Sequence, residues 1–169
     1  MTAFLLIGLV VVIGDSNALP YDDGGYPTEL ARLTGERVEA LPLPGAGVIR
    51  GGRARARPAV RTAALMGATT VVLALGTNDL LTAATPGQVA RVTARRYWQA
   101  RRFAERVRVA PCLPSIPTCL ETRAELARLI PPADLIDVSG LGRELFYDPV
   151  HLNAAGRAEL ARRIAEGLR

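Results

Sequence analysis

The amino-acid sequence has no lysine, a single histidine and few aromatic residues, which make up 5% of its 169 positions. The net charge of +5 therefore comes entirely from arginine, a residue that often recognises phosphate or nucleic acid. The arginines are spread over several segments, however, and few aromatic side chains lie among them to stack on bases. We interpret the arginines as solvated helix faces and expect no nucleic-acid partner.

The scarcity of histidine and cysteine limits the chemistry available to the chain. General-base catalysis near neutral pH most naturally uses imidazole, so His151 is the one candidate for this role. Cys112 and Cys119 have no histidine neighbours in the sequence, which makes a zinc site a poor interpretation. A local disulfide and two unpaired thiols both remain open for this pair. No cofactor or metal is expected.

Long hydrophobic runs are also rare, although 49% of the residues are hydrophobic. The apolar stretch over residues 3–13 is too short to span a bilayer, and it lacks a basic leader region and a cleavage site. We interpret it as a buried strand and expect no membrane span and a cytoplasmic location, with secretion left open if a leader has been removed. The length predicts one domain over residues 1–169, and the oligomeric state is not indicated.

Apolar runs alternate with helical patterns along the chain, which predicts a parallel sheet covered by helices. The predicted strands are rich in Val, Ile and Leu without strict alternation, as expected for strands buried on both faces. They cover residues 5–13, 37–43, 70–75, 106–113 and 135–138. The predicted helices cover residues 28–33, 58–66, 86–105, 118–130 and 153–168.

Polar residues follow the ends of the predicted strands, where open α/β sheets bind their ligands. Ser16 follows the first strand, Gly45 the second and Asn78 the third, while Asp148 and His151 precede the last helix. Because the carboxyl ends of parallel strands meet at one edge, we expect these segments to converge there.

The pairing of a serine, a histidine and an aspartate favours nucleophilic catalysis. A serine hydroxyl is a weak nucleophile until a base removes its proton, and His151 can do so through one ring nitrogen. Asp148, three residues upstream, is placed to hold the other nitrogen. A lone histidine would otherwise be interpreted as a surface residue, but together with Ser16 the three residues predict a catalytic triad.

Attack on an ester also requires hydrogen-bond donors for the developing oxyanion. The candidates are the backbone N–H of Ser16, that of a glycine in the bend Pro44-Gly45-Ala46-Gly47, and the side-chain amide of Asn78. Arg50 and Arg53, beyond the bend, are candidates for attracting an anionic substrate.

Three short segments of the chain resemble the signature blocks of one family. Gly14-Asp15-Ser16-Asn17, Gly76-Thr77-Asn78-Asp79 and Asp148-Pro149-Val150-His151 are similar, in order and separation, to blocks of the SGNH hydrolases (GDSL-type esterases and lipases). The resemblance implies a flavodoxin-like three-layer α/β/α sandwich with a five-stranded parallel sheet of order 2-1-3-4-5. It also implies a serine esterase mechanism without metal or cofactor.

Carried over to this sequence, the resemblance makes Ser16 the nucleophile, His151 the base and Asp148 its orienting acid. It places Ser16, Gly45 and Asn78 in the oxyanion hole. Two positions depart from the family pattern. The glycine block lacks the usual Ser or Thr, so Gly47 is an alternative to Gly45, and Asn17 stands where many relatives carry an apolar residue.

The short connections between the predicted elements leave little sequence for a lid. We therefore expect an open, shallow site in a serine esterase that hydrolyses small-molecule esters with short acyl chains, of the acetyl type. An acyltransferase with an alcohol or sugar acceptor and a non-catalytic domain that retains the fold are the alternatives. An intact triad argues against the non-catalytic alternative.

Overall fold

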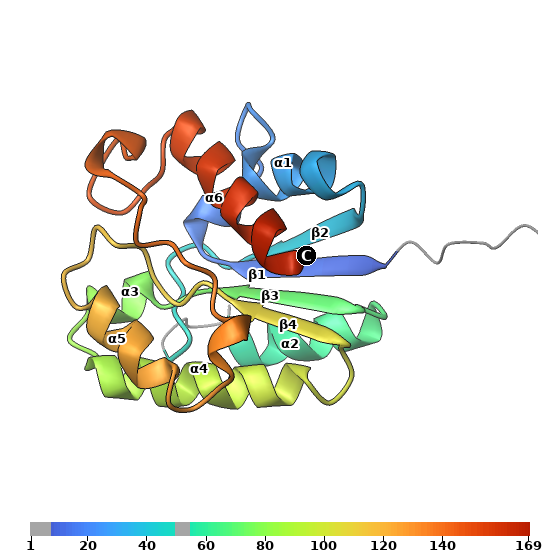
Figure 1. Cartoon of the computed structure of the whole chain (residues 1–169), viewed down its shortest axis with the longest axis horizontal. Coiled ribbons are helices and arrows are strands. Elements are labelled where there is room, and N and C mark those ends of the chain that lie inside the picture. The colour runs from blue at the N-terminus through green and yellow to red at the C-terminus, as the bar shows by residue number, and fades with distance from the viewer. Residues whose placement is uncertain (1–7, 50–54) are drawn as a thin grey trace, which may run out of the picture.

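The computed structural model describes residues 8–49 and 55–169, which form three layers around one parallel sheet (Figure 1). The sheet has four strands in the order β2-β1-β3-β4, and every pair of neighbours is parallel. The strands are β1 (Leu9–Gly14), β2 (Arg37–Pro42), β3 (Thr70–Ala74) and β4 (Arg106–Val109).

Helices cover both faces of the sheet (Figure 1). Helices α1 (Gly25–Thr34) and α6 (Ala154–Leu168) lie on one face. Helices α2 (Ala56–Leu65), α4 (Pro86–Ala100) and α5 (Cys119–Leu126) lie on the other. The connections contain one short α-helix and three 3₁₀ helices, namely α3 (Thr77–Leu80), η1 (Ser16–Ala18), η2 (Pro132–Asp134) and η3 (Arg143–Leu145).

The central strand β1 supplies side chains to both halves of the core. Val11 and Ile13 pack under α2 and α4, whereas Val10 and Val12 pack under α1 and α6. All four side chains are fully buried. Burial of one such side chain contributes about 1.5–3 kcal/mol to the stability of the fold. Because successive side chains of β1 point to opposite faces of the sheet, this one strand stabilises the packing of both helix layers. The carboxyl end of this strand is thereby held rigidly in the middle of the sheet.

Local sequence signals account for the start of the two longest helices. Thr85 and Gln88 form a reciprocal capping box at the start of α4, because each side chain accepts a hydrogen bond from the other residue's backbone N–H, at 3.3 and 2.9 Å. Pro86 then occupies the first turn, where its missing N–H has no cost. The side chain of Asn153 caps α6 by accepting from the N–H of Gly156 at 2.9 Å.

The predicted parallel α/β sandwich is confirmed, but the prediction of a fifth strand over residues 135–138 is wrong within the described part of the chain. This segment forms one isolated parallel bridge, between Val109 and Leu135, with a 2.9 Å hydrogen bond from the N–H of Ile136 to the Val109 carbonyl. The predicted strand over 106–113 is also too long. Pro111 has no N–H to continue the ladder of β4, and η2 occupies the residues just before Leu135.

The remaining boundaries differ from the predictions by a few residues. The first predicted strand begins before residue 8, and that part lies outside the described residues. Helix α4 ends at Ala100 instead of residue 105, because a tight turn over the next residues returns the chain to β4. Helix α5 is shorter than predicted, and the short helix α3 after β3 carries no sequence pattern that would predict it.

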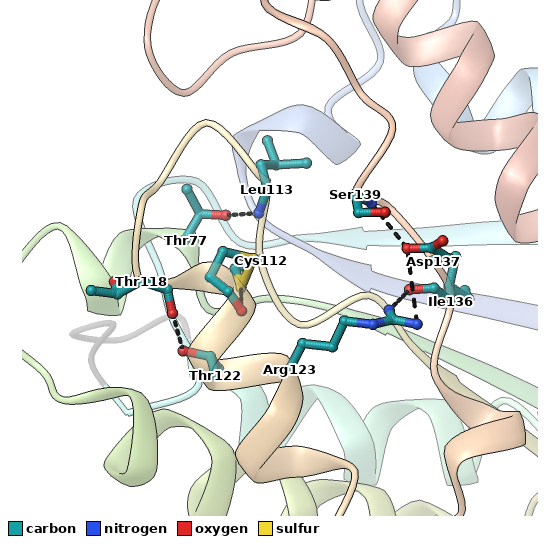
Figure 2. Close-up of a disulfide and its surroundings, with 10 residues drawn as sticks. Thr77, Cys112, Leu113, Thr118, Thr122, Arg123, Ile136, Asp137 and Ser139 are labelled. Carbon is teal, nitrogen blue, oxygen red and sulfur yellow. Dashed lines mark hydrogen bonds and ion pairs between the residues drawn. A yellow bond between two sulfur atoms is a disulfide. The ribbon is translucent and has the colours of Figure 1, made fainter.

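The two cysteines are joined in a disulfide, which decides the alternative that the sequence left open (Figure 2). Cys112 and Cys119 close a loop between the end of β4 and the start of α5. Their sulfur atoms pack with Ile116 against Leu80 and Val150. The loop is also fastened to α3, since the N–H of Leu113 donates to the hydroxyl of Thr77 at 3.1 Å (Figure 2). The disulfide therefore braces the sheet edge at which Val150 lies.

Removal of this disulfide is expected to destabilise the protein. The bond spans a sequence separation of 7, and closure of so short a loop is worth about 2–3 kcal/mol. The double variant Cys112→Ser/Cys119→Ser should therefore melt roughly 4–12 °C below the wild type in a calorimetric scan. Dithiothreitol should lower the melting temperature of the wild type by a similar amount and leave the double variant unchanged. A wild type indifferent to dithiothreitol would contradict the disulfide.

Candidate active site

The carboxyl ends of the three neighbouring strands β2, β1 and β3 meet at one edge of the sheet. Gly14, the last residue of β1, lies in register with Pro42 of β2 on one side and with Ala74 of β3 on the other. The N–H of Leu43 still donates to the Gly14 carbonyl, at 2.8 Å. The segments that follow these strands, and that contain the predicted site residues, therefore start from neighbouring points.

Ser16, His151 and Asp148 lie within hydrogen-bond distance of one another. The imidazole Nε2 of His151 is 3.0 Å from Oγ of Ser16, and its Nδ1 is 2.7 Å from Oδ2 of Asp148. Because a carboxylate can only accept, Nδ1 carries the hydrogen and Nε2 is left to accept the proton of the Ser16 hydroxyl. This arrangement can generate a serine nucleophile.

The carboxylate of Asp148 is held by its own loop. Its Oδ1 accepts the N–H of Val150 at 2.8 Å and that of His151 at 2.7 Å, which forms an aspartate-stabilised turn. The hydrogen bond from Val150, supported by those from His151, lowers the pKa of Asp148 below its ordinary value. Asp148 therefore stays ionised, and remains an acceptor for the imidazole, at pH values below those at which most carboxylates take up a proton.

The loop that carries His151 is a short antiparallel turn with an aromatic wall. Phe146 and Leu152 form an isolated antiparallel bridge, and the N–H of Tyr147 donates to the carbonyl of His151 at 3.1 Å. The ring of Tyr147 stacks on the imidazole, with centroids 5.6 Å apart and planes 9° from parallel. Sequence reasoning missed this residue, although an aromatic residue directly before Asp148 is the signal that could have identified it.

Asn17 joins the serine turn to the histidine loop. Its amide nitrogen donates to the carbonyl of Val150 at 3.1 Å, and its amide oxygen accepts the N–H of Leu152 at 2.9 Å. These two contacts hold the backbone immediately before and after His151. Only a primary amide can donate and accept in this way, so the departure from an apolar residue at this position has a structural use. The amide is 4% exposed, so both hydrogen bonds are shielded from water.

The side chain of Asp15 stabilises the turn that carries Ser16 and Asn17. Its carboxylate caps η1, accepting the backbone N–H of Asn17 at 2.9 Å and the side-chain N–H at 3.2 Å. Burial raises the pKa of Asp15, and the hydrogen bonds from Asn17 oppose that rise. Both contacts are to Asn17, so the carboxylate of Asp15 supports the turn that carries Ser16 and takes no part in the contacts between Ser16, His151 and Asp148.

A buried arginine contacts the histidine loop directly and the serine turn through Tyr21. Arg157 of α6 is 8% exposed, pairs with Asp23 at 2.5 Å and donates to the carbonyl of Leu152 at 2.6 Å. Its guanidinium also lies 4.2 Å from the ring centroid of Tyr21. The hydroxyl of Tyr21 in turn donates to the Ser16 carbonyl at 2.9 Å. Arg157 thus links α6 to the serine turn through Tyr21.

Both glycines of the bend after β2 have structural reasons to be glycine. The N–H of Ala46 donates to the Leu43 carbonyl at 2.9 Å, and Gly45 has φ of +69°, as at the third position of a type II turn after Pro44. A Cβ on Gly47 would lie 2.0 Å from a carboxylate oxygen of Asp79. The bend therefore needs both residues, and neither glycine is singled out as an oxyanion donor.

The glycine bend is fastened to α3. The carboxylate of Asp79 accepts the N–H of Val48 at 2.6 Å and that of Ile49 at 3.2 Å. The amide nitrogen of Asn78 donates to the Ala46 carbonyl at 3.0 Å, which uses one of its two hydrogens. The second hydrogen is available to a ligand. The structure thus brings Asn78 and the bend together, whereas Arg50 and Arg53 lie outside the described residues.

Two further features were sought in the described part of the chain. No group of three or more His, Cys, Asp or Glu side chains placed to hold a metal ion is found among these residues. Within the same ranges, no helix combines the length and the apolar character needed to cross a membrane.

Comparisons with known proteins give matches in structure alone. No protein-family model and no curated protein sequence matches the chain. A lipolytic protein of the G-D-S-L family from Veillonella parvula DSM 2008 has a TM-score of 0.73 and 17% identity, with 94% of this chain and 96% of that chain covered. The acetyl xylan esterase AlAXEase has a TM-score of 0.72 and 17% identity, with 95% and 100% covered.

An acetylxylan esterase from Geobacillus stearothermophilus, in the form of a catalytic mutant, has a TM-score of 0.74 and 14% identity, with 95% of this chain and 94% of that chain covered. These three similarities extend over nearly the full length of each protein. The chain therefore has the same fold as these G-D-S-L lipolytic and acetyl xylan esterase proteins, which is the class of fold that the resemblance of the three sequence blocks implied.

The substitution Asn17→Leu is expected to impair the nucleophile more than the fold. It keeps the branching at Cγ but leaves the Val150 carbonyl and the Leu152 N–H without partners, at about 1–3 kcal/mol each. A displacement of His151 by about 1 Å should slow the labelling of Ser16 by a fluorophosphonate roughly 100-fold. Labelling rates and melting temperatures would be measured together.

The matched control is Thr85→Ala, which removes the side-chain cap of α4 at a cost of about 1 kcal/mol and lies outside the serine turn and the histidine loop. It should lower the melting temperature and leave the labelling rate of Ser16 close to that of the wild type. Equal labelling of wild type and Asn17→Leu would show that the amide does not position the histidine.

Proposed function

We propose that the chain is a member of the SGNH hydrolases and acts as a serine esterase on short acyl esters, of the acetyl type. The observation that carries the proposal is the contact of 3.0 Å between Ser16 Oγ and His151 Nε2, with Asp148 on the opposite ring nitrogen. The likeness of the fold to acetyl xylan esterases supports the same class of substrate.

In the proposed reaction, Ser16 Oγ attacks the ester carbonyl while its proton passes to Nε2 of His151. The carbonyl electrons move onto oxygen, and the backbone N–H groups of Ser16 and Gly45 and the amide of Asn78 stabilise that oxyanion, with Gly47 as the alternative glycine. Collapse of the adduct expels the alcohol, which takes the proton from His151, and leaves an acyl group on Ser16. Water, deprotonated by His151, then releases the acid and restores the serine.

The preference for short acyl groups is supported by the openness of the site. The side chains of His151 and Asp148 are 29% and 37% exposed, so the reacting atoms lie close to the surface. Tyr147, itself 58% exposed, offers a single flat wall. Such a site has little apolar surface to bury a long acyl chain. Transfer of the acyl group to an alcohol or sugar would use the same residues, and no contact described here favours it over hydrolysis.

The location of the protein remains a prediction. The disulfide between Cys112 and Cys119 is a feature more typical of oxidising compartments than of the cytoplasm. It therefore supports the secreted alternative to the cytoplasmic location expected from the sequence.

Hydrolysis of p-nitrophenyl esters tests the proposed nucleophile and base. Ser16→Ala and His151→Ala are each expected to lower kcat by several orders of magnitude, about 10⁴–10⁶-fold. Ser139→Ala, a change at an exposed serine, serves as the control and should retain wild-type turnover. p-Nitrophenyl acetate should be cleaved faster than the octanoate. Turnover that survives loss of Ser16 would exclude it as the nucleophile, and faster cleavage of the octanoate would refute the short-chain preference.

The pH dependence of kcat/KM should report the imidazole alone. His151 is the one histidine of the chain, and it must be neutral to accept the serine proton. Asp148 has a pKa held below its ordinary value, chiefly by the N–H of Val150, so its carboxylate stays ionised at pH values at which an ordinary aspartate takes up a proton. On acidification, kcat/KM for p-nitrophenyl acetate should fall with the slope of one proton. A slope of two protons above about pH 4 would contradict this assignment.

A further inference from the structure

The arginines of this chain are unevenly distributed with respect to its carboxylates. Between Glu39 and Glu105 the sequence contains ten arginines and a single acidic residue, Asp79. Asp79 is fully buried and binds backbone N–H groups of the glycine bend. The middle of the chain therefore contributes a large excess of positive charge. Helices α2 and α4 both belong to this part of the chain and lie side by side on one face of the sheet (Figure 1).

A groove on the surface of these two helices gathers the positive charge. We call it the arginine groove and define it by the residues that line it, which are Arg57, Arg61, Arg95, Arg96, Trp98, Gln99 and Arg102. Two of its arginines come from α2, and the others come from α4 and the turn that follows it. Guanidinium groups from separate elements thus face one another across the same hollow.

No carboxylate among the described residues forms an ion pair with an arginine of the groove. In the described ranges, nine arginines form ion pairs with Asp or Glu, and none of the nine lines the groove. The paired arginines are Arg32, Arg37, Arg106, Arg108, Arg123, Arg128, Arg157, Arg162 and Arg163. Like charges gathered without counter-ions destabilise a fold, whereas they create the positive potential that draws in an anion.

Arg96 shows the effect of this crowding most directly. Its Nε is buried and has no hydrogen-bond partner among the described residues, while one terminal nitrogen donates to Gln99 at 3.2 Å. Burial, together with the charges of Arg57 and Arg95, lowers the pKa of Arg96. The negative charge of a carboxylate in the groove would offset the repulsion among these arginines. The two oxygens of a carboxylate also match two N–H donors of the planar guanidinium group.

Trp98 adds an apolar surface to the charged groove. The side chain of Trp98, the one tryptophan of the sequence, is 51% exposed. The indole N–H donates to the Leu129 carbonyl at 3.3 Å, and the ring packs edge-on against Tyr97, at 4.9 Å between centroids. The indole is therefore fixed in orientation. A fixed, exposed aromatic face beside charged donors suits a ring that has both an apolar face and an acidic substituent.

The groove leads toward the catalytic edge of the sheet. Arg95 also lines a neighbouring cleft with Arg91 and Ile49. The N–H of Ile49 donates to the carboxylate of Asp79, the residue after Asn78. Arg91 and Arg102 lie on the same side of α4 and its following turn, and at the rise of a helix they are separated by roughly 16 Å. A positively charged path therefore runs from the far end of α4 to the glycine bend.

We propose that the arginine groove binds an acidic stretch of the substrate, and that this substrate is a glycan whose sugars carry both carboxylates and acyl esters. The inference rests on the proposed esterase function, since the triad would remove acyl groups at the end of the path. A nucleic acid also carries repeated negative charge. It lacks such acyl esters along its backbone, however, and proteins that bind single strands usually stack successive bases on several aromatic residues. Among the described residues, Trp98 is the one aromatic side chain that lines this groove.

Binding of oligosaccharides tests the groove separately from catalysis. An oligogalacturonate would be titrated against the wild type by calorimetry, with a neutral xylo-oligosaccharide of the same length for comparison. The groove variant combines Arg57→Gln, Arg61→Gln and Arg102→Gln. The matched control combines Arg32→Gln, Arg37→Gln and Arg162→Gln, which removes the same charge from α1, β2 and α6. Because the groove arginines repel one another, the groove variant should melt no lower than the wild type.

The wild type should bind the oligogalacturonate, more weakly as NaCl rises, and bind the neutral oligosaccharide at least about tenfold more weakly. The groove variant should lose about tenfold or more in affinity for the oligogalacturonate, while the control variant should lose much less. Equal losses in the two variants, or equal binding of acidic and neutral oligosaccharides, would overturn the proposal. So would tighter binding of a single-stranded DNA of equal charge that depends on the groove, because the groove would then be a nucleic-acid site.

Kinetics separate failure of the groove from failure of the proposed function. On O-acetylated polygalacturonate, the groove variant should raise KM about tenfold with kcat within about twofold, while hydrolysis of p-nitrophenyl acetate stays unchanged. An unchanged KM in an enzyme that still cleaves p-nitrophenyl acetate would refute the groove alone. A wild type that cleaves neither ester would refute the esterase, and the titration of the oligogalacturonate would still decide whether the groove binds acidic sugars.

Discussion

Two hydrogen bonds between the Asn17 amide and the backbone on either side of His151, one donated by the amide and one accepted by it, join segments 133 and 135 positions apart in the sequence. The geometry of the triad depends on this junction, because it sets the distance between the serine turn and the histidine loop. Asp15 holds the amide from below, and Arg157 holds the carbonyl of Leu152 from α6. The site thus consists of two short turns locked to each other, each of which is anchored to a rigid element.

The arginines of this protein differ in whether a carboxylate lies close to them. Arg32 on α1 and Arg162 on α6 lie beside carboxylates three or four residues away and are largely neutralised within their own helices. Helices α2 and α4 contain no acidic residue, so their arginines have no carboxylate in the same helix, and five arginines from α2, α4 and the turn after α4 line one groove. The same residue type thereby serves two purposes, stabilising one face of the molecule and leaving a positive groove on the other.

The predictable part of the fold follows from apolar runs that form buried strands. The strands around Val11, Val72 and Val107 were predicted from composition alone, and the triad from the spacing of Asp148 and His151 with a serine after a strand. The sequence could not show that the fifth strand is missing, because residues 135–138 have the composition of a strand. Its pairing is limited to one bridge by Pro111 and η2, features that act on the neighbouring segment.

By itself the sequence determined which residues are available for chemistry: one histidine, the aspartate before it, and polar residues after strands. These properties are local, because side-chain type and short spacing do not depend on the rest of the chain. Tertiary structure alone decided that Asn17 flanks His151, that the cysteines pair, and that unpaired arginines meet across α2 and α4. Those contacts join residues brought close only when the sheet and its helices pack, so no local pattern in the sequence encodes them.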